Sequence, residues 1–424
     1  MKQVDVIVLG AGIIGICTAL QLQRKGLQVA LVDKNAPGEQ TSFGNAGLIE
    51  RASLFPYAFP RQIGKILHNA TNRSVEAHYH IGELIRIAPQ LARYWWNSAP
   101  ERHEKIMQAA RPLIENSVNM HLELAQAANA QNILHADGWI KVARNEHTMA
   151  GLLDDVALLK GFGLQIDVLD RAALKTREPD LTDAAVGGIH FLDPQAVRDP
   201  IDLSRAYVAY FKQLGGVFIH GDAQTLTEIS NPNHSEAASS SNAWQVQTQE
   251  GALVAPQAVL CLGAWTVEIT RRLGYRLPMF VKRGYHKHYA LAGEAKMNHT
   301  IYDADGGYVL AKMNQGIRLT TGVEFAKITA PATPVQLKRA EPLARELIPL
   351  GEPLQDRAWM GYRPCFPDIL PVIGPAPRHQ GLWLHFGHHH HGLTHSAASG
   401  MLITQMMTGQ ETFADATPFS AERF

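Results

Sequence analysis

The sequence predicts an α/β protein with a Rossmann-like domain that is assembled from separated stretches of the chain, together with a second, α+β domain. The chain opens with a strand, a glycine-rich turn, a helix and a second strand across Val4–Asp33. Helical periodicity without strand alternation then occupies Leu54–Ala130. Strand patterns that end in glycine return at Ala258 and Leu382. Because the opening pattern recurs in the middle and near the end, we predict a discontinuous first domain with the second inserted twice.

The expected domain boundaries follow these changes of pattern. Residues 1–53, 196–268 and 358–424 are assigned to the first domain, and residues 54–195 and 269–357 to the second. A small, polar, low-complexity stretch at 230–242 is expected to be a solvated loop between two strands.

Composition excludes several classes of protein. The chain has 424 residues, of which 46% are hydrophobic, and its 39 basic residues balance 39 acidic ones. The apolar content supports a folded core, and the charge balance argues against a nucleic-acid binder. No stretch approaches the roughly 18 uninterrupted apolar residues of a membrane span. The three cysteines are far apart and form no CxxC pair, so we expect a cytoplasmic protein without a disulfide framework.

The glycine-rich turn after the first strand carries the first functional signal. Three glycines in a GxGxxG pattern permit a tight turn, close approach of a pyrophosphate and close packing of the helix on the sheet. The N-terminus of that helix then offers free N–H groups to phosphates. The candidate binding residues here are Gly10, Ala11, Gly12, Ile13, Ile14 and Gly15.

An acidic residue at the end of the second strand completes this pattern. Asp33 follows Gly15 by 18 positions, where a carboxylate can accept hydrogen bonds from ribose hydroxyls, and Lys34 is next to it. The combination predicts an adenine dinucleotide site, against the alternative of a purely structural turn. The motif alone does not separate FAD from NAD.

A second glycine-rich segment, TSFGNAG at residues 41–47, directly follows that strand and could let the backbone approach a flat ring system. Here the chain resembles the FAD-dependent D-amino-acid oxidase and dehydrogenase superfamily, in particular its bacterial D-amino-acid dehydrogenase branch. Further stretches are similar to this family in order along nearly the whole chain: LCLGAW at 260–265, LP and RGY between 277 and 285, GGYV at 306–309, GYRPCFPD at 361–368 and GHHHHGLT at 387–394. The sequence HKH at 286–288 departs from the family's more apolar continuation.

The resemblance implies a non-covalent FAD site and a substrate domain with a mainly antiparallel sheet. Beyond the glycine-rich turn, Asp33 and Lys34, it assigns cofactor contacts to Thr41, Ser42, Asn45, Ala46, Gly47, Leu48, Ala223, Gly263, Trp265, Gly361, Gly387, Gly392, Leu393 and Thr394. The last three precede a helix whose dipole could stabilise negative charge on the reduced flavin.

The resemblance also implies the catalytic residues. Arg363 corresponds to the arginine that holds the substrate carboxylate, which a planar guanidinium can engage with two parallel hydrogen bonds. Tyr308 is in the position of a tyrosine that also reaches the carboxylate. The expected reaction moves hydride from Cα to flavin N5, and the imino acid is then hydrolysed to a 2-oxo acid and ammonia. We name no catalytic base.

The run of four histidines at 388–391 admits three interpretations. Adjacent histidines on one short turn cannot all converge on an ion, so no metal site is predicted. His390 is a candidate substrate-contacting residue, and a solvated turn is the alternative. Cys365 does not fall where some relatives attach flavin covalently, so we expect a buried thiol.

Several functional alternatives remain open at this stage. The same fold and arginine could serve a secondary amine such as sarcosine, glycine, proline or hydroxyproline. The rivals of other classes are an NAD-dependent dehydrogenase and a flavin-binding assembly subunit. The dehydrogenase resemblance favours a quinone or another electron carrier over oxygen. Aromatic and basic residues within 55–102 could contact the inner face of the cytoplasmic membrane, although packing under a helical subdomain is the favoured explanation.

Overall fold

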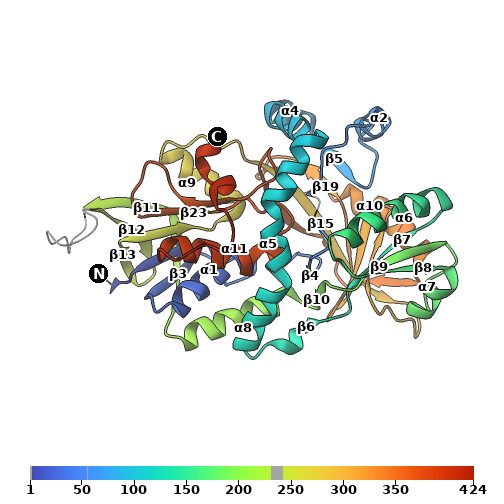
Figure 1. Ribbon diagram of the computed structural model, residues 1–424, viewed down its shortest axis with the longest axis horizontal. Helices are drawn as coiled ribbons and strands as arrows, with labels where there is room; N and C mark the ends of the chain where they lie inside the picture. The colour runs from blue at the N-terminus through green and yellow to red at the C-terminus, as the bar shows by residue number, and fades with distance from the viewer. Residues whose placement is uncertain (1, 55, 231–241) are drawn as a thin grey trace.

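The computed structural model describes residues 2–54, 56–230 and 242–424, and two large sheets dominate it (Figure 1). The first sheet lies on the side of the N-terminus, and the second lies at the opposite end of the long axis. Most of the expected polar loop at 230–242 lies outside the described residues.

The first sheet has nine strands in the order β1-β13-β12-β11-β3-β2-β14-β23-β22. Its central strands β11, β3, β2, β14 and β23 are parallel, as expected for a Rossmann-like domain. Neighbouring strands come from distant parts of the chain, since Ile7 pairs with Ala258, which pairs with Leu382. The strands are β1 (Lys2–Gln3), β2 (Val6–Leu9), β3 (Val29–Asp33), β11 (Val217–Ser230), β12 (Asn242–Thr248), β13 (Gly251–Ala255), β14 (Gln257–Leu260), β22 (Val372–Pro375) and β23 (Leu382–Phe386).

Four helices cover one face of this sheet, and a short helix, α9 (Thr266–Arg272), follows β14. The covering helices are α1 (Ile13–Arg24), α5 (Pro100–Ala127), α8 (Pro200–Gln213) and α11 (Gly392–Met407). Their apolar side chains form one continuous core with the sheet. The long helix α5 lies across the middle of the molecule against α11 (Figure 1), although its sequence falls within the predicted second domain.

The second sheet has the order β5-β19-β15-β18-β17-β16-β7-β9-β8 and is mainly antiparallel, and β20 and β21 also pair with β15. This confirms the predicted fold class. The strands are β5 (Ala77–Tyr79), β7 (Trp139–Ala143), β8 (Ile166–Asp170), β9 (Gly187–Phe191), β15 (Phe280–Leu291), β16 (Thr300–Asp303), β17 (Tyr308–Met313), β18 (Gly316–Thr320), β19 (Val323–Phe325), β20 (Leu350–Pro353) and β21 (Trp359–Cys365).

Smaller elements complete the fold. A three-stranded sheet is formed by β4 (Leu48–Ile49), β10 (Gln195–Val197) and β6 (Leu134–His135). Helices α6 (Glu146–Gly161), α7 (Arg171–Arg177) and α10 (Val335–Leu347) pack near the second sheet. The domain boundaries given above stay a prediction.

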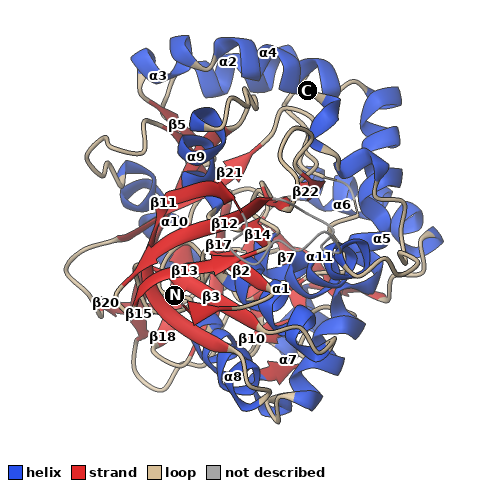
Figure 2. Ribbon diagram, turned by 90° about the vertical axis from the view of Figure 1, so that its left-hand side faces the viewer, coloured by secondary structure: helices blue, strands red, loops and turns tan. Residues whose placement is uncertain are grey.

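Three short helices form a lobe along one edge of the molecule, which Figure 2 shows at the top. They are α2 (Ile63–Ala70), α3 (Ile81–Arg86) and α4 (Ala88–Asn97). Among the described residues, no helix combines the length and the apolar character needed to cross a bilayer.

Candidate active site

The glycine-rich turn has the geometry that its sequence predicts. Gly10 has a φ of +107°, and a Cβ added there would come within 2.6 Å of the carbonyl oxygen of Cys261, which directly follows the neighbouring strand β14. A Cβ on Gly15 would overlap the carbonyl oxygen of Gly10. A Cβ added to Gly12 would contact only the Ser42 hydroxyl, at 3.4 Å, so this glycine borders open space. The first and third glycines therefore serve packing, and the second leaves room for a ligand.

Asp33 lies at the end of β3 beside this turn. One carboxylate oxygen accepts a hydrogen bond from the Ala11 N–H at 2.8 Å, and the other accepts from the Asn35 N–H at 2.9 Å. These bonds fix the carboxylate at the rim of the cavity described next, where a ribose would be held.

A cavity of about 1010 Å³ extends from the glycine-rich turn to the second sheet and the lobe of short helices. It is lined by most of the predicted cofactor residues: Gly10, Gly12, Ile13, Ile14, Asp33, Lys34, Thr41, Ser42, Asn45, Ala46, Leu48, Ala223, Gly263, Trp265, Gly361, Gly387, Gly392, Leu393 and Thr394. Ala11, Gly15 and Gly47 do not line it. A Cβ on Gly47 would overlap the carbonyl of Val197, so this glycine packs a turn against β10.

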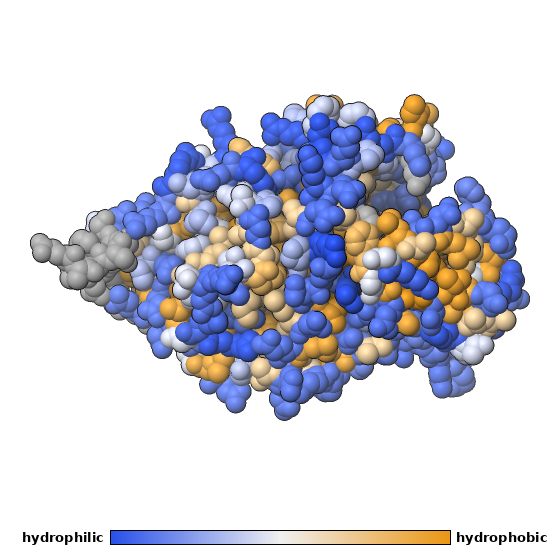
Figure 3. Space-filling model, in the orientation of Figure 1, coloured by the Kyte–Doolittle hydropathy of each residue, from blue (hydrophilic) through white to orange (hydrophobic). Residues whose placement is uncertain are grey.

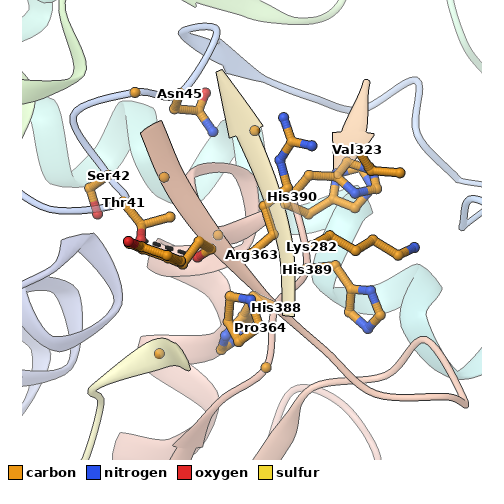
Figure 4. Close-up of a pocket in the computed structure, with 18 of the residues that line it drawn as sticks. Thr41, Ser42, Asn45, Lys282, Val323, Arg363, Pro364, His388, His389 and His390 are labelled. Atoms are coloured by element: carbon orange, nitrogen blue, oxygen red, sulfur yellow. Dashed lines mark hydrogen bonds between the residues drawn. The ribbon is translucent and has the colours of Figure 1, made fainter. Parts of the chain in front are cut away.

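An aromatic side chain packs between the TSFGNAG segment and β21. The indole of Trp359 fills the space beside Gly44 and Gly361, where a Cβ on either glycine would overlap the ring. The Thr41 hydroxyl donates to the carbonyl of Tyr362 at 3.1 Å (Figure 4). The small residues therefore bring two backbones together beside the cavity.

The N-terminus of α11 forms another wall of the cavity. No side chain caps this helix, and its first residues Gly392, Leu393 and Thr394 line the cavity. The Thr394 hydroxyl accepts from the Glu50 N–H at 3.1 Å and donates to the carbonyl of Leu48 at 3.3 Å. The uncapped helix end can stabilise negative charge in the cavity.

Arg363 extends from β21 into the cavity, as its predicted role requires (Figure 4). Its guanidinium donates one hydrogen bond to the carbonyl of Gly322, at 2.8 Å. Burial lowers the pKa of this arginine from its ordinary value. A guanidinium held this way has donors left for a carboxylate.

Tyr308 also lines the cavity, but its hydroxyl already has partners. The Arg144 guanidinium donates to it at 3.0 Å and pairs with Asp303 at 2.7 Å. Burial, followed by the charge of Asp303, raises the pKa of Tyr308. The hydroxyl is thus part of a buried network, and contact with a substrate carboxylate stays a prediction. Tyr302 on the adjacent strand β16 lines the same cavity.

The rings of the histidine turn are packed inside the cavity wall. His389 accepts a hydrogen bond from the Phe366 N–H at 3.2 Å, and its φ is +54°. The His390 ring packs edge-on against Tyr57, with centroids 4.6 Å apart, and its Nε2 atom has no hydrogen-bond partner. Burial lowers the pKa of both histidines well below the ordinary value. Both rings are therefore neutral at pH 7.

One group within the described residues could hold a metal ion, and it is not this turn. It consists of His78, His80 and Glu324, whose ligand atoms lie within 4.8 Å of one another. The Glu324 carboxylate is already bound by the buried Arg283, at 2.6 Å, and by the Tyr285 hydroxyl.

Sequence reasoning missed several residues of the cavity wall. Glu50 lies there next to Trp139, whose indole N–H donates to it at 3.2 Å, and burial raises the pKa of Glu50 to about 7. Lys282 from β15 and Tyr57 also line the cavity. None of these residues belongs to a sequence motif. Strand register and the packing of loops place them in the cavity wall.

The residues present fit FAD. An elongated glycine-lined groove, an uncapped helix end and an acidic residue beside the turn are the features that a dinucleotide needs. The volume of the cavity lies at the upper end of the range for small-molecule sites, so it leaves room for a large cofactor together with a substrate.

Comparisons with known proteins agree with this geometry. A family model described as FAD dependent oxidoreductase matches residues 5–406. The chain is 28% identical to a D-amino-acid oxidase of Bradyrhizobium diazoefficiens, across 99% of this chain and 98% of the relative. It is 27% identical to a D-amino acid dehydrogenase of Sinorhizobium medicae, across 99% of each chain. Among solved structures, glycine oxidase from Geobacillus kaustophilus superposes with a TM-score of 0.75 at 20% identity, and each chain is covered completely.

Proposed function

The chain belongs to the family of FAD-dependent oxidoreductases, and we propose that it oxidises the carbon–nitrogen bond of an amino acid, with D-amino acids as the substrate class. The observation that carries this proposal is Arg363, a cavity-wall guanidinium that makes no ion pair with a described carboxylate. The names of the full-length relatives, D-amino-acid oxidase and D-amino acid dehydrogenase, support the choice of substrate.

In this proposal the protein positions the substrate. Arg363 binds the carboxylate and fixes Cα in the cavity, so that the bond to be oxidised has one orientation. FAD supplies the hydride acceptor at its N5 atom. The substrate loses a hydride from Cα and a proton from nitrogen, and water then converts the imino acid into a 2-oxo acid and ammonia. The neutral rings of His389 and His390 leave the positive charge of this part of the cavity wall to Arg363 and Lys282.

We propose that the cofactor is held without a covalent bond. Cys365, the thiol nearest to Arg363 in sequence, is fully buried and does not line the cavity. Burial raises the pKa of this thiol and also that of Cys261, which does line the cavity, and this disfavours the reactive thiolate at both positions.

The test is an anaerobic visible spectrum of the purified protein before and after adding single amino acids. We expect a flavin band near 450 nm (roughly, as for flavin cofactors) that D-amino acids bleach and their L-enantiomers do not. Bleaching by sarcosine, glycine or proline alone would replace the proposal by a secondary-amine activity. A flavin band that no amino acid bleaches would contradict the proposal.

We further propose that the electron acceptor is a quinone and that the helical lobe rests on a membrane surface. Eight of the fifteen exposed large apolar side chains described lie between residues 57 and 96, and Figure 3 shows apolar atoms at the outer edge of α2. They are Tyr57, Ile63, Ile66, Leu67, Ile81, Ile85, Trp95 and Trp96. Arg61 stacks on Trp95 at 4.0 Å and Arg102 on Trp96 at 3.9 Å. This mixture suits an anionic lipid surface.

The cavity reaches this lobe, since Ile66, Leu84 and Leu91 contribute to its wall. A lipid-soluble acceptor could therefore enter directly from the bilayer.

Vesicle sedimentation measures this contact. The protein is expected to sediment with anionic phospholipid vesicles, and the double variant Ile63→Ser/Ile85→Ser should lose most of that binding because it removes apolar area from the contact. Leu153→Ser/Leu158→Ser, which changes exposed leucines on α6, is the matched control and should bind normally. Equal binding by both double variants would exclude the lobe as the contact surface.

A further inference from the structure

Two cationic side chains extend into the cavity from neighbouring strands of the second sheet. Lys282 on β15 and Arg363 on β21 are directly opposite each other in the antiparallel register. Residues paired in this way have side chains on the same face of a sheet, with Cα atoms about 5 Å apart. Both line the cavity, and Figure 4 shows the ammonium group and the guanidinium pointing in different directions. The two charges can therefore reach different parts of one ligand.

Neither of these cations has a carboxylate partner within the part of the chain that the structure describes. Lys282 is 7% exposed, lies 4.4 Å above the ring of Tyr94 and donates to the Tyr94 hydroxyl at 3.3 Å. Arg363 contacts a carbonyl oxygen, as described above.

Other buried cations of the same sheet are paired. Arg283, which is next to Lys282, binds Glu324 at 2.6 Å, and Arg318 lies 3.8 Å from Asp199. Burying a charge without a partner costs free energy, so the fold normally supplies a counter-ion. Among the described residues of this sheet, Lys282 and Arg363 line the cavity without a carboxylate counter-ion.

The nearby wall offers little compensating charge. Glu50 bonds to Trp139 rather than to either cation, and its pKa of about 7 leaves it partly protonated. Glu76 is exposed at the cavity rim. The histidine rings beside the two cations are neutral, and the ring system of oxidised flavin carries no net charge. A zwitterionic amino acid with one carboxylate would satisfy one of the two cations.

We propose that the substrate carries two carboxylates, with Arg363 binding the α-carboxylate and Lys282 binding the second one. The substrate class is then an acidic D-amino acid, such as D-aspartate or D-glutamate. This inference rests on the proposed function, and it assigns Lys282 as the residue that determines side-chain specificity.

The test compares each acidic amino acid with its amide, which has nearly the same shape and no charge. For the wild-type protein we expect kcat/KM to be at least about tenfold higher for D-glutamate than for D-glutamine, and likewise for D-aspartate over D-asparagine. In Lys282→Met this preference should disappear through a rise in KM for the acids, while the values for the amides are retained. Lys287→Met, the same change on the same strand but outside the cavity wall, should keep the preference.

A loss of activity in Lys282→Met that is equal for acids and amides would overturn the proposal, because Lys282 would then act on a group that all substrates share. Equal kcat/KM values for acids and amides in the wild-type protein would also overturn it.

A binding measurement separates this inference from the proposed function. Glutarate has two carboxylates and cannot be oxidised at a carbon–nitrogen bond. We expect it to perturb the flavin spectrum at a concentration at least about tenfold below that of its monoamide, and Lys282→Met should abolish the difference. If no amino acid reduces the flavin, the proposed function fails, and the glutarate comparison still decides the assignment of Lys282. Equal binding of the two compounds would refute that assignment.

Discussion

Replacing Arg363 by methionine should lower kcat/KM for the best amino acid by about a hundredfold to a thousandfold, the loss expected when one partner of a desolvated charge pair is removed. The guanidinium reaches the cavity from a strand, and its only described hydrogen bond leaves further donors for a carboxylate. Methionine keeps a comparable length and apolar volume, so FAD should stay bound. Steady-state kinetics together with the flavin content of the purified variant measure both effects.

Two further variants serve as a conservative replacement and as a control for this experiment. Arg363→Lys keeps the charge but loses bidentate geometry, so its kcat/KM should fall between those of the wild type and the methionine variant. Arg205→Met, at an exposed arginine 3.6 Å from Asp202, should behave as the wild type. A methionine variant at position 363 with an unchanged KM would show that the carboxylate is bound elsewhere.

The second large effect is expected at the glycine-rich turn. Gly15→Ala places a methyl group on the carbonyl oxygen of Gly10, where backbone must move, so we expect a loss of about 3 kcal/mol or more in the free energy of unfolding. Gly12→Ala meets only a hydroxyl at 3.4 Å, so the protein should fold but bind FAD poorly because the methyl group occupies the approach of the pyrophosphate. Thermal unfolding and the flavin released by acid precipitation measure the two outcomes.

The matched control is Gly151→Ala, since this glycine is on α6 with no atom within 4 Å of the added Cβ. It should retain both stability and flavin. If the Gly12 variant bound FAD as well as the wild type, the cofactor would not approach the backbone at that turn.

The elements with strong local signals were predicted well from sequence. The opening strand, helix and strand predicted across Val4–Asp33 correspond to β2, α1 and β3, and the strand pattern predicted from Leu382 corresponds to β23. Alternating or continuous apolar residues bounded by glycine determine such elements locally. The strand β11 is harder to recognise from sequence, because its pairing with β12 shifts register between Asp222 and Thr227. A bulge of this kind looks like a break in a sequence pattern.

At the site, sequence patterns predict the residues that belong to motifs but not those that long-range contacts bring to the cavity. Arg363 and the cofactor glycines belong to motifs, and the structure gathers most of them around one cavity. Lys282 reaches that cavity because β15 and β21 pair in one register, which depends on two stretches about 80 positions apart in the chain. The hydroxyl of Tyr308 bonds to Arg144, whose segment lies in the other predicted insertion, so no local pattern reveals the partner. Long-range packing sets these contacts.

The central sheet of the FAD side also determines the order in which the chain can be completed during synthesis. Its β2 strand has all four residues buried, and its neighbour β14 is in turn covered by β23, which ends at Phe386. The ribosome must therefore deliver residue 386 before β14 gains its second neighbour in the sheet. Until then, apolar edges of the growing sheet remain open to other nascent chains. We expect production of this protein to depend on chaperones that shield these exposed strand edges until residue 386 has been synthesised.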